Sequence, residues 1–199
     1  MGVVDPDGNA VSMTHSLGMP SGVITAGLGI MYNGCMSVFD PRPRRAGSIA
    51  PGKSRFTAMA PTIVFKDGEP HIVIGAPGGT FITMGILQGI LNMLDFGMPV
   101  SDAIAAPRFS ANSDTIAVSN RIPRFVTDEL EALGYRVARS YLSYVFAGVH
   151  AIEHGRDVLA VLLEPFLEPL ISGVAFFSVP RSLLRRDQLV INHLILAAA

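Results

Sequence analysis

The segment Gly75-Ala76-Pro77-Gly78-Gly79-Thr80 is the feature that most narrowly constrains this chain. It joins an apolar run typical of a β-strand (His71 to Ile74) to a longer apolar run typical of a helix (Thr80 to Phe96). Two adjacent glycines at such a corner leave their backbone N–H groups accessible, and the start of a helix adds unpaired donors and a positive dipole end. The sequence therefore predicts a corner that stabilises negative charge, on either a bound anion or a transition-state oxyanion.

Known phosphate-binding patterns do not fit this corner. A Walker loop requires lysine followed by serine or threonine, whereas Gly79 is followed by Thr80 and Phe81. The Rossmann spacing also fails, because the segment has the form Gly-x-x-Gly-Gly. A tight structural turn and an oxyanion hole both remain open, and the second requires a nucleophile close by.

The sequence offers no conventional nucleophile. It has no Gly-x-Ser-x-Gly elbow, and His15 and Ser16 cannot act as a pair within one strand, since neighbouring side chains point to opposite faces. The remaining histidines are scattered, with no metal-ligand spacing, so we expect no metal and no cofactor. Cys35 is the only cysteine and cannot form an internal disulfide.

Composition excludes several classes of protein. A length of 199 residues suits one domain, and a formal net charge of −1 argues against a nucleic-acid partner. The apolar run from Val158 to Pro180 is interrupted by two glutamates and two prolines, which argues against a membrane span. No signal peptide is recognisable at the start, and the compartment, cytoplasmic or periplasmic, stays open.

Turn residues predict two β-hairpins. Asp5 to Asn9 separates the strands Val3–Val4 and Ala10–Thr14, and Lys66 to Pro70 separates Thr62–Phe65 from His71–Ile74. Between them, Gly22 to Tyr32 is expected to be a loop running into another strand, and the proline- and arginine-rich stretch Asp40 to Gly52 an exposed loop.

Three helices are expected after these hairpins. The helix Thr80–Phe96 is apolar nearly all round, which predicts that it is sandwiched between layers. A short helix is expected after Ser101 and before Pro107, and a third with Thr127 as its N-cap and Gly134 just past its end, followed by a strand at Tyr135–Val137. Hairpins followed by buried helices predict an α+β fold with antiparallel sheets.

Several blocks, taken together and in this order, resemble the small subunit of the γ-glutamyltranspeptidase family over about residues 3–152. The blocks are Val3-Val4-Asp5 with Gly8-Asn9-Ala10-Val11-Ser12, Pro51-Gly52-Lys53, Met59 to Val64, Gly75 to Gly79, Asp95-Phe96-Gly97-Met98 and Ala106-Pro107-Arg108. The resemblance implies the N-terminal-nucleophile hydrolase fold, a four-layer αββα sandwich. It also implies a precursor that cleaves itself and a large-subunit partner from that precursor. The new N-terminal threonine would attack a γ-glutamyl amide with its own amine as the base.

The resemblance also implies roles for individual residues. Gly78 and Gly79 would supply the oxyanion-hole N–H groups, and Thr14 and Ser16 would lie close to the nucleophile, Ser16 matching the threonine that orients it. Thr57 and Ala58 match a serine pair that binds the substrate α-carboxylate.

Other positions depart from the family pattern. Gly18, Cys35 and Val38 match positions that are usually polar or acidic, and valine cannot pair with the α-amino group of a glutamyl substrate. The nucleophilic threonine would lie three residues before Met1, outside this sequence. The chain taken alone is therefore expected to be inactive.

The sequence thus predicts the small-subunit portion of a γ-glutamyltransferase-like amide hydrolase or transpeptidase that acts on γ-glutamyl donors such as glutathione. Two alternatives stay open: a related N-terminal-nucleophile acylase on another amide, and an inactive truncated product. We expect a family-like domain over residues 1–157 and a divergent tail over 158–199, for which a frameshifted terminus is one hypothesis.

Overall fold

The computed structural model describes residues 1–5, 7–154 and 159–161. The chain divides into two compact units, which are treated separately below. The first unit comprises Met1–Thr14 and the residues from Met59 onward, and the second comprises His15–Ala58. The divergent tail expected after residue 157 lies outside the described residues, apart from 159–161.

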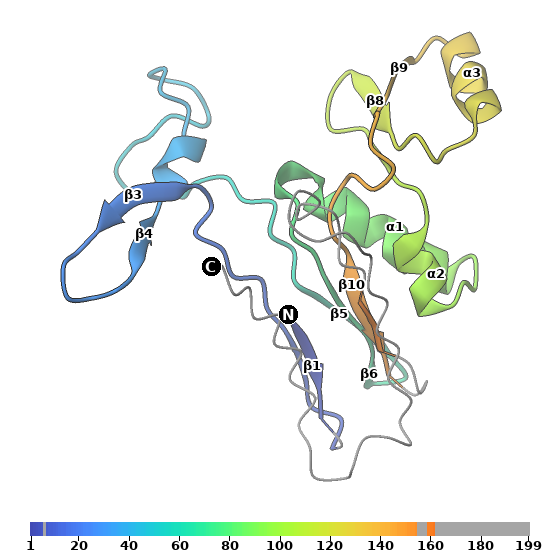
Figure 1. The fold of residues 1–199 in the computed structure, drawn as a ribbon, viewed down its shortest axis with the longest axis horizontal. Coiled ribbons are helices and arrows are strands. Elements are labelled where there is room, and N and C mark those ends of the chain that lie inside the picture. Colours follow the sequence, from blue (N-terminus) through green and yellow to red (C-terminus); the bar gives the residue numbers. More distant parts are fainter. Residues whose placement is uncertain (6, 155–158, 162–199) are drawn as a thin grey trace. The chain divides into compact units, whose positions relative to one another are not determined.

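An antiparallel sheet of four strands organises the first unit, in the order β11-β10-β6-β5. Figure 1 labels β5, β6 and β10 of this sheet. Its strands are β5 (Thr62–Lys66), β6 (Glu69–Gly75), β10 (His150–Glu153) and β11 (Leu159–Val161). The predicted hairpin between β5 and β6 is confirmed. Its turn residues Asp67 and Gly68 both have positive φ, 52° and 86°, as the primed two-residue turns of hairpins require.

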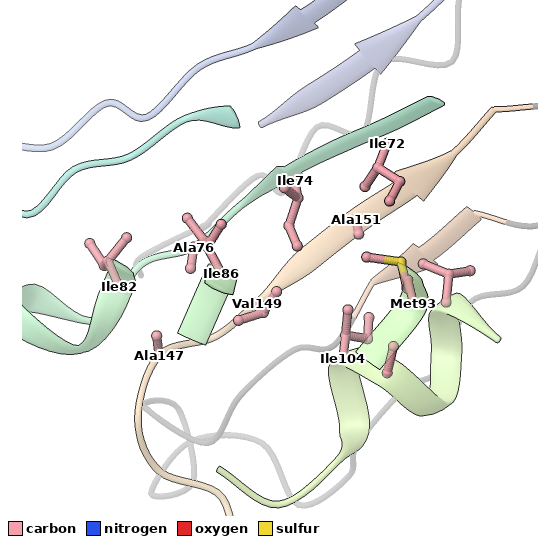
Figure 2. Packing of buried hydrophobic residues seen from close by; sticks show 12 residues of the cluster. Ile72, Ile74, Ala76, Ile82, Ile86, Met93, Ile104, Ala147, Val149 and Ala151 are labelled. Atoms are coloured by element: carbon pink, nitrogen blue, oxygen red, sulfur yellow. The ribbon is translucent and has the colours of Figure 1, made fainter. Parts of the chain in front are cut away.

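Helices cover one face of this sheet (Figure 1). They are α1 (Ile82–Leu94), which a 3₁₀ turn, η2 (Gly79–Phe81), precedes, and α2 (Val100–Ala105). Ile72 and Ile74 point from β6 toward these helices and join Ile86, Ile104 and Val149 in one buried cluster (Figure 2). The predicted helix after the glycine corner is thereby confirmed.

The opposite face of the sheet carries the predicted hairpin of β1 (Gly2–Val4) and β2 (Ala10–Ser12). Its packing is close, because a Cβ placed on Gly2 would lie 3.1 Å from Val73 Cγ1. The Ser12 hydroxyl donates a hydrogen bond to the Ile74 carbonyl over 3.1 Å. Residues of β6 therefore alternate between helix side and hairpin side, as the two-residue period of a strand dictates. The result is an α+β arrangement with a helix layer and two β layers.

The expectation that α1 is enclosed on all sides is wrong for the described part of the chain. Its inner face is buried, whereas Leu87, Leu91 and Leu94 are 46%, 38% and 48% exposed. Sequence periodicity reports that a face is apolar, but only a neighbouring layer can bury it. Among the described residues, the sheet supplies that layer on one side of the helix.

Two predicted helix starts are also wrong. The helix α2 begins at Val100, one residue before Ser101, and α3 (Arg124–Ala132) begins three residues before Thr127. Proline precedes both helices and favours this choice, because its φ is preset and its missing N–H costs nothing at a helix start. The Thr127 hydroxyl instead donates to the Arg124 carbonyl over 2.7 Å, inside the helix.

The predicted end of α3 is confirmed. Gly134 has φ 90° and donates its N–H to the Glu131 carbonyl (2.9 Å), while Tyr135 donates to Leu130 (3.1 Å). These two bonds form a Schellman motif, which satisfies the last carbonyls of the helix.

A three-stranded sheet lies around α3 in the sequence: β7 (Phe109–Ser110), β8 (Thr115–Val118) and β9 (Arg136–Arg139). The pair β8–β9 is parallel, which corrects the expectation of purely antiparallel pairing. The connection through α3 is the reason, because a helical crossover returns the chain to the end at which the preceding strand began.

The second unit contains a hairpin of β3 (Pro20–Ile24) and β4 (Met31–Asn33), followed by the 3₁₀ turn η1 (Cys35–Val38). The stretch Gly22 to Tyr32 was expected to be a loop before a strand, and its ends instead form both strands of this hairpin. The basic stretch Asp40 to Gly52 is irregular, as predicted.

Candidate functional site

The glycine corner connects the end of β6 to the start of α1. Gly78 and Gly79 both have positive φ, 143° and 59°. Phe81 donates its N–H to the Gly78 carbonyl over 3.2 Å, which closes the 3₁₀ turn. In the described part of the chain, no protein group accepts a hydrogen bond from the N–H of Gly78 or Gly79. Two unpartnered donors at one turn suit the binding of an anionic oxygen.

The two glycines are required for different physical reasons. A Cβ on Gly78 would lie 2.5 Å from the Ala147 Cα, a distance that real Cβ atoms do not reach. A Cβ on Gly79 would meet nothing within 4 Å. Gly78 is therefore needed for close backbone packing, and Gly79 chiefly for its left-handed conformation.

The hairpin β1–β2 and the strand β10 converge on the end of β6 that leads into the corner. His150 pairs with Gly75, and its Nε2 lies 3.2 Å from the Met1 amino nitrogen. The Met1 amino group also donates to the Met13 carbonyl over 2.7 Å. The strand β1 thus starts where β6 ends, at the side of the sheet from which the corner emerges.

The packing around His150 disfavours its charged form. Burial, and secondarily the positive Met1 amino group, lower the pKa of His150 to about 4 from its ordinary 6.5. A hydrogen bond with the Gly148 backbone acts in the opposite direction and is weaker. At neutral pH the imidazole is therefore neutral.

A pH titration of stability checks this arrangement. A histidine whose pKa is lower in the folded state stabilises the fold fully above the unfolded pKa, and stability is lost as the pH falls toward the folded pKa. Between pH 7 and 4.5 the native chain should lose about 2 to 3 kcal/mol of unfolding free energy more than His150→Gln does. The measurement is urea unfolding at both pH values. Parallel losses in the two proteins would show that His150 is not the responsible group.

The other candidate residues belong partly to the first unit and partly to the second. Thr14 is the last residue of the first stretch of the first unit and is half-buried. Ser16 is exposed in the second unit, where its Oγ accepts the Gly18 N–H over 2.9 Å. Thr57 is exposed and Ala58 half-buried at the end of that unit.

Within the second unit, the structure brings Gly18 and Cys35 together. Gly18 has φ 67°, and a Cβ there would lie 3.0 Å from Cys35 Sγ. The Cys35 thiol donates to the Leu17 carbonyl over 3.5 Å. Val38 ends the same 3₁₀ turn that Cys35 begins and is 42% exposed. This part of the second unit presents no charged side chain at these three positions.

Two features near the corner have no counterpart among the sequence candidates. Arg108 is 4% exposed, and its guanidinium donates to the carbonyls of Ala147 (3.3 Å) and Ile104 (2.9 Å). Phe146 and Ala147 have φ 72° and 76°, the left-handed region that glycine favours. Arg108 lies in the block Ala106-Pro107-Arg108 that resembles the family, but the resemblance gave it no role, and no residue type in Phe146-Ala147 signals positive φ.

Among the described residues, no group of three or more His, Cys, Asp or Glu side chains is placed to hold a metal ion. The helices in the described ranges are all too short or too polar to cross a membrane.

Comparisons with known proteins agree on one family. The family model described as Gamma-glutamyltranspeptidase matches residues 1–168. The Acylase ACY 1 proenzyme of Pseudomonas sp. (strain V22) is 39% identical over 157 residues, 78% of this chain and 28% of that protein. The glutathione hydrolase proenzyme of Pseudomonas aeruginosa is 37% identical over 150 residues, 67% of this chain and 27% of that protein. The chain thus spans just over a quarter of the length of these curated relatives.

A solved structure supports the fold. The crystal structure of the Helicobacter pylori gamma-glutamyltranspeptidase T380A mutant superposes with a TM-score of 0.71 at 29% identity. The match covers 90% of this chain and 96% of that one. The expected N-terminal-nucleophile hydrolase class is therefore confirmed, and the described layers of the first unit are part of its αββα sandwich.

Proposed function

This chain belongs to the γ-glutamyltranspeptidase family, and we propose that residues 1–157 are the small-subunit portion of an amide hydrolase or transpeptidase. The observation that carries the proposal is the glycine corner, where no described residue accepts a hydrogen bond from the N–H of Gly78 or Gly79. The relatives of this chain are proenzymes, which supports a large-subunit partner derived from the same precursor.

The geometry suggests where a nucleophile would act. Met1 lies beside His150, next to Gly75, so a strand continued backwards from β1 would run past the glycine corner. Three residues span at most about 10 Å. A threonine at the position that the family resemblance gives, three residues before Met1, would therefore lie within about 10 Å of Met1, on the side of the sheet from which the corner emerges.

The proposed chemistry is acyl transfer. The threonine hydroxyl attacks the amide carbonyl carbon, its proton passes to the threonine amine, and the N–H groups of Gly78 and Gly79 stabilise the resulting oxyanion. The threonine ammonium then gives this proton to the leaving nitrogen, the C–N bond breaks, and the amine departs, which leaves an ester on the threonine. Water then completes hydrolysis, or a second amine completes transpeptidation. Thr14 and Ser16 would position the nucleophile, and Thr57 and Ala58 would face the acyl group.

The direct test compares two proteins on a chromogenic γ-glutamyl anilide. One is the product of the whole gene, including any coding region upstream of Met1, and the other is the polypeptide of residues 1–199. We expect release of the aniline by the first and none by the second, because the attacking threonine is outside residues 1–199. Turnover by the 199-residue polypeptide, or none by the whole product on any acyl anilide, would contradict the proposal.

A second candidate is an acylase whose substrate lacks a charged α-amino group. Asp40 is the only carboxylate between His15 and Ala58, and Arg42 binds it at 2.8 Å. This contact holds the pKa of the Asp40 carboxyl below its ordinary value. Val38 offers no charge in its place. These residues, together with the acylase relatives, favour an acyl group without an α-ammonium group.

A matched pair of substrates separates the two candidates. Glutaryl and γ-glutamyl anilides differ only in the α-ammonium group, so the ratio of their kcat/KM values reports recognition of that charge. The acylase candidate predicts a preference for the glutaryl anilide. It also predicts that Val38→Asp shifts the ratio toward the γ-glutamyl anilide by about 10- to 100-fold, the effect of one hydrogen bond to a charged group. Val38→Asn is the uncharged control and should shift the ratio less.

A further inference from the structure

We propose that the turn Phe146–Ala147 is a positioning element that holds the backbone of Gly78 in the orientation required of an oxyanion-hole donor; this inference rests on the proposed function. The turn lies just before β10 and far from the corner in the sequence, yet it packs directly on the backbone of Gly78. Neither residue would touch the substrate.

The backbone of this turn is strained. Four non-glycine residues in the described ranges have positive φ. Two of these four, Phe146 (72°) and Ala147 (76°), are neighbours in the sequence. Each such residue costs roughly 1 to 2 kcal/mol relative to the right-handed conformation. Both are buried, at 5% and 1% exposed, so solvent does not relieve the strain. A conformation of this kind persists only where the surroundings enforce it, and it occurs often at functional sites.

Three sets of contacts connect the turn to the corner. The Gly148 N–H donates to the Pro77 carbonyl over 2.9 Å, which fixes the peptide just before Gly78. The Ala147 Cα and Cβ occupy the space where a side chain of Gly78 would be. The Phe146 ring meets the Phe81 ring edge to face, with centroids 5.1 Å apart.

Arg108 and the helix α1 also hold the turn in place. The Arg108 guanidinium donates to the Ala147 carbonyl, and a Cβ on Gly85 of α1 would lie 3.1 Å from both the Ala147 Cβ and the Phe146 carbonyl oxygen. The close approach of α1 therefore depends on a glycine that faces the turn. Figure 2 shows Ala147 on the chain that leads into β10, beside Ile82 and Ile86 of α1.

These contacts restrict rotation of the peptide planes on either side of Gly78. Glycine without them samples a wide range of φ and ψ, and a donor that reorients during the reaction loses the benefit of a preorganised site. The strained alanine thus supplies the rigidity that the glycine lacks.

The test is Ala147→Gly, which relieves the strain and removes the Cβ against Gly78. The matched control is Asp67→Gly, which also replaces a positive-φ residue (52°) but lies in the β5–β6 turn. Hydrogen exchange of the Phe81 and Gly148 amides, whose acceptors are Gly78 and Pro77, is measured in the full chain, with thermal unfolding alongside. We expect at least tenfold faster exchange at both amides in Ala147→Gly, a Tm that does not fall, and no change at these amides in Asp67→Gly.

In the whole-gene product, the same substitution should lower kcat at least tenfold on the better anilide and leave KM within twofold. Unchanged exchange in Ala147→Gly would overturn the proposal whether or not the enzyme is active. Faster exchange with unchanged kcat would also overturn it, since the turn would then be structural only. Absence of activity in the unmodified product would refute the proposed function, and the exchange result would still decide whether the turn holds the corner.

Discussion

Gly78→Ala is expected to destabilise the full chain by about 3 to 5 kcal/mol, combining the strain of φ 143° with overpacking against Ala147. The new methyl group would lie 2.5 Å from the Ala147 Cα and 3.2 Å from its nitrogen. Backbone atoms cannot rotate aside as a flexible side chain can, so either the corner or the turn before β10 must move. Urea unfolding followed by circular dichroism measures the loss.

The neighbouring glycine provides the control. Gly79 has φ 59°, and an added Cβ would meet nothing within 4 Å. Gly79→Ala should therefore cost only about 1 to 2 kcal/mol, the penalty for a left-handed alanine. Equal losses in the two variants would mean that Gly78 does not pack on Ala147 as described. Because either substitution can also reorient an N–H donor, activity alone would not distinguish them, whereas stability does.

Ile74→Ala is expected to cost about 2 to 5 kcal/mol, the range for removing a large aliphatic side chain from a close-packed core. Ile74 is 1% exposed and belongs to the buried cluster between sheet and helices (Figure 2). Its Cδ1 lies 3.2 Å from the place a Cβ would take on Gly89 of α1. The glycine lets the helix approach so closely that the isoleucine fills the interface. Its removal leaves a cavity between sheet and helix. Urea unfolding of the full chain is again the measurement.

An exposed residue of the adjacent strand is the matched control. Phe65 in β5 is 61% exposed, and Phe65→Ala should change the unfolding free energy by less than about 0.5 kcal/mol. If Ile74→Ala lowered the unfolding free energy as little as Phe65→Ala does, the result would contradict the described packing of α1 on β6. A loss confined to Ile74→Ala supports the described core.

The sequence correctly predicted those turns and helix ends at which a single residue type favours the required backbone conformation. Asp67-Gly68 marks a primed turn, and Gly134 marks the end of α3 in a Schellman motif; both were predictable because one residue type favours the conformation. The predicted starts of α2 and α3 were wrong because two helix-start signals lie close together at each: a proline, and a serine or threonine that can act as an N-cap. A preceding proline decided the start in both cases, and the polar residues Ser101 and Thr127 became part of the helix.

The candidate site was only partly predictable for a different reason. Gly78 and Gly79 were identifiable because adjacent glycines between a strand and a helix are unusual. Arg108 and the turn Phe146–Ala147 were not, since their roles arise from contacts with residues far away in the sequence. The proposed roles of Ser16, Gly18 and the other residues of the second unit stay predictions.

The sequence by itself determined the family, the hairpins β1–β2 and β5–β6, the helix after the glycine corner and the presence of two glycines able to donate N–H groups. These follow from short-range preferences and from motifs that lie contiguous in the chain. Only the tertiary structure decided why Gly78 must be glycine and which residues hold it. The physical reason is steric: Ala147 comes within 2.5 Å of a Gly78 Cβ position only after β10 has paired with β6.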